Sequence, residues 1–199
     1  MLVRHRGHEP RISPDATVAP GAVISGDVAV EGGARILHGV VLSAEDGQIR
    51  VGAETVILEH ALVRGRAGHP AVIGARVMIG PHAHVNGAIV HDGSFIATGA
   101  AVFPGAVIGA GAEVRVNAVV QVNTVIEPGG VVPIGWVAVG APAQLFSPDR
   151  HEEIWAVQRT LDFPGTVYGV DRDAGMAEIM RRQSAFYAAH DQDEILRRD

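Results

Sequence analysis

The chemistry open to this chain depends on histidine, carboxylate and arginine side chains. The 199 residues include ten histidines and no cysteine, and all 16 basic residues are arginine. Thiolate nucleophiles, disulfides and Schiff-base lysines are therefore excluded. Histidines and carboxylates remain as acid–base groups and as metal ligands.

The most regularly placed histidines are His60 and His82, each three residues after an isoleucine. We expect them to stack about 4.8 Å apart, the usual distance between neighbouring strands. Together with His84 they form a candidate metal site. Other possible ligands nearby in the sequence are Glu59, His69 and His91. The alternative is that all of these are ordinary surface or interface histidines, because this spacing matches no known metal motif.

The elements that position these residues follow from aliphatic residues spaced six apart. The row consists of Val18, Ile24, Val30, Ile36, Leu42, Val51, Ile57, Val63, Ile73, Ile79, Val85, Val90, Ile96, Val102, Ile108, Val114, Val120, Ile126 and Val132. Helices repeat at about 3.6 residues and strands at 2, so neither alone explains a period of six. A short strand and a tight turn, repeated, do explain it. The sequence therefore predicts an all-β parallel β-helix of hexapeptide repeats with stacked aliphatic layers inside.

The sequence suggests three segments: a lead-in over 1–15, the repeat array over 16–146 and a helical segment over 147–199. Ser147 and Pro148 predict the start of a helix, as cap and first-turn residue. The stretch 162–165 (Asp-Phe-Pro-Gly) should break this helix, and a second helix is expected over about 173–189. We expect these C-terminal helices to pack along the β-helix and cover its exposed interior.

The six-residue repeat slips after Leu42, after Val63 and after Val85. These slips are three repeats apart. If three repeats make one coil, the slips stack on one edge in consecutive coils. Insertions in repeat proteins collect on one face, often the binding face, so this edge is the candidate functional site.

Four segments carry a family resemblance, namely 39–47, 55–65, 79–87 and 139–143. With the slips between them, the chain resembles the γ-class carbonic anhydrase family over roughly residues 10–145. The resemblance implies a left-handed β-helix, a homotrimer and a metal site at each subunit interface.

The metal ligands of that family are not retained here. Carried over position by position, its three zinc histidines fall on Arg64, Pro81 and Asn86. Zinc needs histidine, cysteine or carboxylate donors to activate water, and none of these residues supplies one. The resemblance thus implies a degenerate metal site, with no carbon dioxide hydration by the inherited route and no cofactor at that position.

Arg64 in such an interface pocket suggests binding of a small anionic metabolite, since its planar guanidinium matches carboxylate or phosphate. Ser43, Asn86 and Glu45 are the other candidate ligand-binding residues. Glu59 and His84 are the candidate acid–base groups for catalysis. The alternative is structural: Arg64 pairs with Glu59 or Glu45 as an interface ion pair, because an unpaired buried arginine is costly.

Three other functions stay open at this point. Hexapeptide β-helices also include acyltransferases that use acetyl-CoA, although the only loop histidine available as their base is His69. A structural trimer without small-molecule chemistry is another reading. The last is a metal-dependent hydratase or lyase that uses zinc at relocated histidines, with His60, His82 and His84 as ligands. Whether the chain is an enzyme is left open.

Charge and hydropathy limit the kinds of binding partner that this chain can have. The formal net charge is −6 and no basic run occurs, which argues against nucleic acid or an anionic membrane as partner. No stretch reaches the 18–20 or so apolar residues of a membrane span, and the first ten residues lack an apolar signal core. The expected location is cytoplasmic, with a homotrimer and a small anionic ligand as the expected partners.

Overall fold

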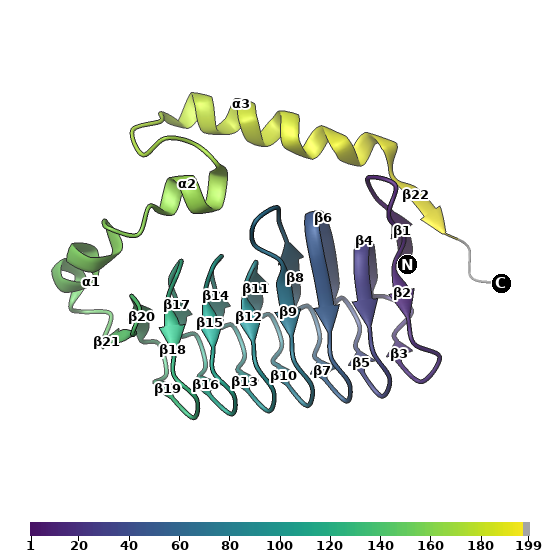
Figure 1. Cartoon of the computed structure of the whole chain (residues 1–199), viewed down its shortest axis with the longest axis horizontal. Helices are drawn as coiled ribbons and strands as arrows, with labels where there is room; N and C mark the ends of the chain where they lie inside the picture. The colour runs from purple at the N-terminus through teal and green to yellow at the C-terminus, as the bar shows by residue number, and fades with distance from the viewer. Residues whose placement is uncertain (197–199) are drawn as a thin grey trace.

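The computed structural model describes residues 1–196, in which the repeats wind into a parallel β-helix with three faces (Figure 1). The first face contains β3 (Thr17–Val18), β5 (Arg35–Ile36), β7 (Val56–Ile57), β10 (Met78–Ile79), β13 (Phe95–Ile96), β16 (Glu113–Val114) and β19 (Val131–Val132). Each strand has two residues, because the chain must turn again after every hexapeptide. The predicted all-β parallel β-helix is confirmed.

The second and third faces meet along an edge that two long strands cross. The second face consists of the first halves of β4 (Val23–Val30) and β6 (Val41–Val51), followed by β8 (Leu62–Gly65), β11 (His84–Asn86), β14 (Ala101–Val102), β17 (Val119–Val120) and β20 (Val137–Val139). The third face consists of β2 (Arg11–Ile12), the second halves of β4 and β6, β9 (Ala71–Ile73), β12 (Ile89–Val90), β15 (Val107–Ile108) and β18 (Val125–Ile126). The crossing strands make this edge structurally different from the other two.

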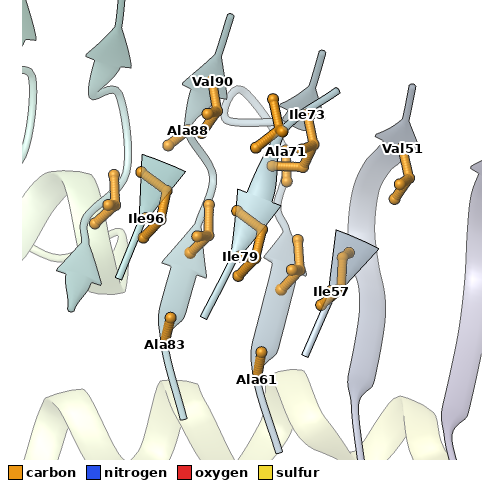
Figure 2. Packing of buried hydrophobic residues seen from close by; sticks show 14 of the residues in the cluster. Val51, Ile57, Ala61, Ala71, Ile73, Ile79, Ala83, Ala88, Val90 and Ile96 are labelled. Carbon is orange, nitrogen blue, oxygen red and sulfur yellow. The ribbon is translucent and has the colours of Figure 1, made fainter. Parts of the chain in front are cut away.

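The core is the stack of aliphatic residues that the period of six predicts. All of the predicted interior residues are buried except Val18, which is half-buried in the first coil. Figure 2 shows how the layers repeat, with Ile57, Ile79 and Ile96 following one another in neighbouring coils. Alanines such as Ala61 and Ala83 fill the remaining inward positions, where only a small side chain fits a narrow coil.

One corner shows why glycine is needed at a turn. Gly39 has φ of +72°, and a Cβ placed on it would lie 2.3 Å from Nδ1 of His60 in the next coil. A side chain at this position would therefore suffer both backbone strain and a steric clash. Gly39 allows the imidazole of His60 to lie over the corner below it.

On the second face, the sheet finishes at both ends in a short strand that runs against the coil direction. At one end β1 (Leu2–Arg4) pairs in parallel with β4 and antiparallel with β22 (Glu194–Leu196). At the other end β21 (Gln144–Phe146) pairs antiparallel with β20. The N-terminal and C-terminal segments thus meet at the first coil.

The C-terminal segment forms α1 (His151–Gln158), α2 (Phe163–Tyr168), α3 (Met176–Tyr187) and the 3₁₀ turn η1 (Ala188–Gln192). As Figure 1 shows, α3 extends along the coils back toward β1. No helix in residues 1–196 is long and apolar enough to cross a membrane.

Two details of the helix prediction are wrong. The first helix begins at His151 instead of Ser147, because residues 147–150 form a turn in which the Arg150 N–H donates to the Ser147 carbonyl at 3.0 Å. The stretch 162–165, expected only to break a helix, also begins α2. The Asp162 side chain accepts a hydrogen bond from the Gly165 N–H at 3.3 Å and so caps this short helix.

Candidate functional site

The slips of the repeat lie on one edge in consecutive coils, as predicted. On the second face, Ser25, Ser43, Arg64 and Asn86 occupy the same register position in β4, β6, β8 and β11. We call these four residues the outer row. The preceding residue in each strand points inward, since side chains alternate along a strand. The outer row therefore lies on the outer surface of the β-helix, on the side toward α3 (Figure 1).

The outer row carries polar atoms that lack partners within the described chain. Ser25 Oγ, Arg64 Nε and Asn86 Oδ1 are buried atoms that make no hydrogen bond inside residues 1–196. Nε2 of His84, two residues before Asn86, is in the same condition. Buried polar groups are normally satisfied, so a run of four with spare hydrogen-bonding capacity is typical of a surface that receives a ligand or a partner.

Arg64 is the positively charged residue of the outer row. Its Nε lies 3.8 Å from Oε1 of Glu45, an ion pair without a hydrogen bond, and its guanidinium lies 5.9 Å from the ring centre of Tyr187 in α3. Its side chain is 26% exposed. Burial, and to a lesser extent the charge of Arg64, lowers the pKa of His84, so this imidazole is neutral at pH 7.

Glu45 follows Ser43 by two residues, inside the first slip, and it is 4% exposed. Its Oε1 accepts a hydrogen bond of 2.8 Å from the Ser43 hydroxyl. Its Oε2 lies 3.0 Å from Nε2 of His190, which belongs to η1. Within one chain, the contact of Arg64 with Glu45 is therefore the weaker one, because His190 and Ser43 make the closer contacts with this carboxylate.

A second carboxylate links the two ends of the chain at the same place. Asp193 Oδ1 lies 2.6 Å from Nδ1 of His5, and Asp193 Oδ2 lies 2.8 Å from Nδ1 of His190. The two imidazole rings stack with centroids 4.4 Å apart. Burial opposes ionisation of Asp193, but the hydrogen bonds from His190 and His5 lower the pKa of its carboxyl below the usual range. Burial likewise opposes the charged form of His190, yet Asp193 and Glu45 raise its pKa.

The C-terminal helices hold this region against the coils through arginine. Arg66 donates to the Val167 carbonyl at 3.1 Å and stacks on the Phe186 ring at 4.4 Å. Arg6 donates to the Phe186 carbonyl at 3.2 Å. Even so, α3 has no buried residue, so it covers the outer row only partly.

The structure separates the remaining predicted site residues from the outer row. His60 and His82 stack with ring centroids 5.2 Å apart, as expected from their spacing. They lie at the corner between the first and second faces with Glu59, whose carbonyl accepts the His82 N–H at 3.0 Å. His69 faces Arg66 in a tight turn closed by two backbone hydrogen bonds, and the exposed tip of this turn is Ala67 and Gly68.

Sequence reasoning missed His5, His190 and Asp193. In residues 1–196, the one group of three or more side chains arranged to hold a metal is His5, Glu45 and His190, and it contains none of His60, His82 and His84. His190 and Glu45 are 145 residues apart in the chain, so no spacing motif signals their contact. The only hint is that His190 ends the second expected helix, which the capping argument directs back along the coils.

Comparison with known proteins agrees with this architecture. No protein-family model matches the chain. The chain is 38% identical over 108 residues to γ carbonic anhydrase 3, mitochondrial, of Arabidopsis thaliana, which covers 48% of this chain and 42% of that protein. It is 31% identical over 81 residues to a probable carbonic anhydrase of Methanocaldococcus jannaschii, covering 41% of this chain and 51% of that protein. The chain thus spans about half or less of the length of these curated relatives.

Among solved structures, a hexapeptide transferase family protein from Anaplasma phagocytophilum matches with a TM-score of 0.54 and 24% identity, covering 92% of this chain and 97% of that one. At this identity the match shows the fold alone. The chain is a hexapeptide-repeat β-helix protein. Its resemblance to the γ-class carbonic anhydrases is confirmed over about half its length.

Proposed function

We propose that this chain is a γ-carbonic-anhydrase-like protein that has lost the inherited zinc site and binds a small anionic metabolite at the outer row, around Arg64. The observation that carries the proposal is the pair of unsatisfied buried donors at one register of the second face, the Ser25 hydroxyl and Arg64 Nε. A carboxylate or phosphate supplies acceptors for the guanidinium and excludes water from this strip.

The loss of the inherited site rests on the residues at the corresponding positions. Arg64 and Asn86 are paired neighbours in β8 and β11, and Pro81 lies in the turn before β11. An arginine cation in that place repels a metal ion and attracts an anion. The same substitution thus removes one kind of ligand and favours the other.

A homotrimer is part of the proposal, as the family resemblance implies. Support comes from α3, whose Met176 and Met180 are 69% and 55% exposed while no residue of the helix is buried. An amphipathic helix normally covers its apolar side, and a second copy of the chain provides the surface for that.

The test is the thermal stability of the full chain, in buffer containing EDTA, with inorganic phosphate or succinate as the probe anion. We expect the probe to raise Tm of the wild type. Arg64→Gln should weaken binding about 10- to 100-fold, since a hydrogen bond to a charged group contributes about 1.5–3 kcal/mol. Arg50→Gln, at an exposed position in β6, should leave binding unchanged. An anion effect that survives Arg64→Gln contradicts the proposal.

The second candidate function is acyl transfer from acetyl-CoA, because the hexapeptide β-helix fold, which this chain shares with a hexapeptide transferase family protein, also occurs in acyltransferases. It needs a general base beside the acyl acceptor, and His69, held in a tight turn, is poorly placed for that role. Acetyl-CoA at millimolar concentration should not change Tm beyond the shift given by an equal concentration of phosphate. A larger shift favours the transferase.

A further inference from the structure

His5, Glu45 and His190 form a cluster that adjoins the proposed anion site, because the other oxygen of Glu45 contacts Ser43 and Arg64. They come from the lead-in after β1, from β6 and from η1, and one ligand atom of each lies within 4.8 Å of the others. We propose that these three side chains bind one divalent transition-metal ion, with zinc as the best chemical match, and that Asp193 orients both imidazoles. This inference goes beyond the proposed function and does not depend on a ligand at Arg64.

Asp193 fixes which nitrogen of each histidine is free. Both Nδ1 atoms lie within hydrogen-bond distance of its carboxylate, at 2.6 Å for His5 and 2.8 Å for His190. An ionised carboxylate can only accept, so both Nδ1 atoms carry the proton. In the neutral imidazoles this leaves both Nε2 lone pairs free, and both face Glu45. A carboxylate behind the imidazole is the arrangement that orients metal-binding histidines.

The strongest sign of a ligand is Nε2 of His5. This side chain is 1% exposed, and its Nε2 makes no hydrogen bond within residues 1–196. It lies 4.0 Å from Oε2 of Glu45, which is itself buried. A cation between the two satisfies the lone pair and neutralises the buried carboxylate at once.

The spacing of the three donors is short enough for them to share one ion. Donors bound to zinc at 2.0–2.1 Å lie about 3.3 Å apart. Here Oε2 of Glu45 is 3.0 Å from Nε2 of His190 and 4.0 Å from Nε2 of His5, and the ligand atoms of all three residues lie within 4.8 Å of one another. Two imidazole nitrogens and one carboxylate oxygen match zinc with a fourth position left for water, whereas calcium and magnesium require mostly oxygen donors.

The competing explanation is that protons alone hold the cluster together, with His190 as an imidazolium between Glu45 and Asp193. That arrangement accounts for the 3.0 Å and 2.8 Å contacts of His190. It leaves Nε2 of His5 without a hydrogen bond in the described chain, at 4.0 Å from the Glu45 carboxylate. The two explanations therefore differ in metal stoichiometry.

The experiment uses the untagged full chain, stripped with EDTA, dialysed and titrated with Zn²⁺ in competition with a chromophoric chelator. We expect one Zn²⁺ per chain with a dissociation constant in the micromolar range or below, and a rise in Tm of several degrees at saturating zinc. Asp193→Asn should weaken binding about 10- to 100-fold, as loss of an orienting partner does. His190→Gln should weaken it at least as much.

The matched control is the double variant His60→Gln/His82→Gln, which removes the other stacked histidine pair and should bind zinc like the wild type. Failure of the wild type to take up zinc in the micromolar range overturns the proposal, and so does loss of binding in the control variant alone. The wild-type stoichiometry is decisive even if His190→Gln does not fold. Because the anion test is done in EDTA, failure of either proposal leaves the other standing.

Discussion

Two rows of side chains run side by side on the second face of the β-helix, and they differ in residue type and in hydrogen bonding. The outer row is Ser25, Ser43, Arg64 and Asn86, and the inner row is Ile24, Leu42, Val63 and Val85. Each inner residue is completely buried and aliphatic. Each outer residue is polar, and three of the four have a buried atom that makes no hydrogen bond in residues 1–196. Packing in the core determines the residue types of the inner row, whereas the polar groups of the outer row are available to bind a ligand.

The largest effect should come from the inner row. Leu42→Ala removes a fully buried side chain from a stacked layer and should lower the free energy of unfolding by about 2–5 kcal/mol. Val41→Ala, the outward-facing neighbour in β6, should cost clearly less. Urea denaturation followed by circular dichroism measures both. Equal losses at the two positions would contradict the division into an inner and an outer row.

Within the outer row, substitution of a residue that makes a hydrogen bond should cost more stability than substitution of one that makes none. Ser43→Ala removes the hydroxyl that donates to the buried Glu45 carboxylate at 2.8 Å and should cost about 1.5–3 kcal/mol. Ser25→Ala, one coil away at the same register, removes a hydroxyl whose oxygen is unsatisfied in the described chain. It should be neutral or slightly stabilising, again by urea denaturation. A comparable loss in both variants would show that the Ser43–Glu45 contact contributes nothing specific.

Asn86→Leu should change stability in the opposite direction from a core substitution. Replacing an amide whose buried oxygen has no partner in residues 1–196 by an apolar group of similar size should raise the free energy of unfolding by about 0–1 kcal/mol. The same variant should bind the probe anion more weakly. Stability gained together with binding lost is the usual mark of a functional residue. A clear loss of stability would indicate that Asn86 is structural.

The smallest expected effect is a pH dependence at His84. The pKa of this imidazole is lowered in the folded state by burial and by Arg64, so the unfolded chain binds more protons as the pH falls. Its contribution to stability is therefore present above the unfolded pKa of about 6.5 and is lost below it. His84→Gln should reduce the fall in Tm between pH 7.5 and pH 5.5, measured in EDTA. An unchanged fall would remove His84 as its source.

The coil can be predicted nearly residue by residue because its period ties sequence directly to geometry. A side chain every six residues must fill a layer, and slips of equal spacing must stack. The spacing alone therefore brings Ser43, Arg64 and Asn86 to one edge, where their strands pair in register. Val18 is less buried than its period implies because it belongs to the first coil, which has no complete coil beneath it.

The rest of the site could not be predicted, because its contacts join segments with no common period. His5 meets Asp193 across 188 residues, and no local pattern carries that information. The helix α2 escapes prediction for another reason: Asp162-Phe-Pro-Gly165 contains proline and glycine, which favour a break, while the Asp162 cap is visible only in three dimensions. Closeness in sequence groups Glu59 with Arg64, although the turn before β8 separates them along the second face.

The short reversed strands at the two ends of the large sheet have a consequence for growth of the solenoid. A stack of identical parallel coils presents a free edge at each end, on which coils of another molecule could continue the hydrogen-bond ladder into a filament. On the second face β22 and β21 occupy those edges with three residues each, in the antiparallel sense, so the ladder of that face no longer matches an incoming coil. On this face, a coil of another molecule therefore meets an antiparallel strand in place of the parallel partner that it needs to continue the ladder.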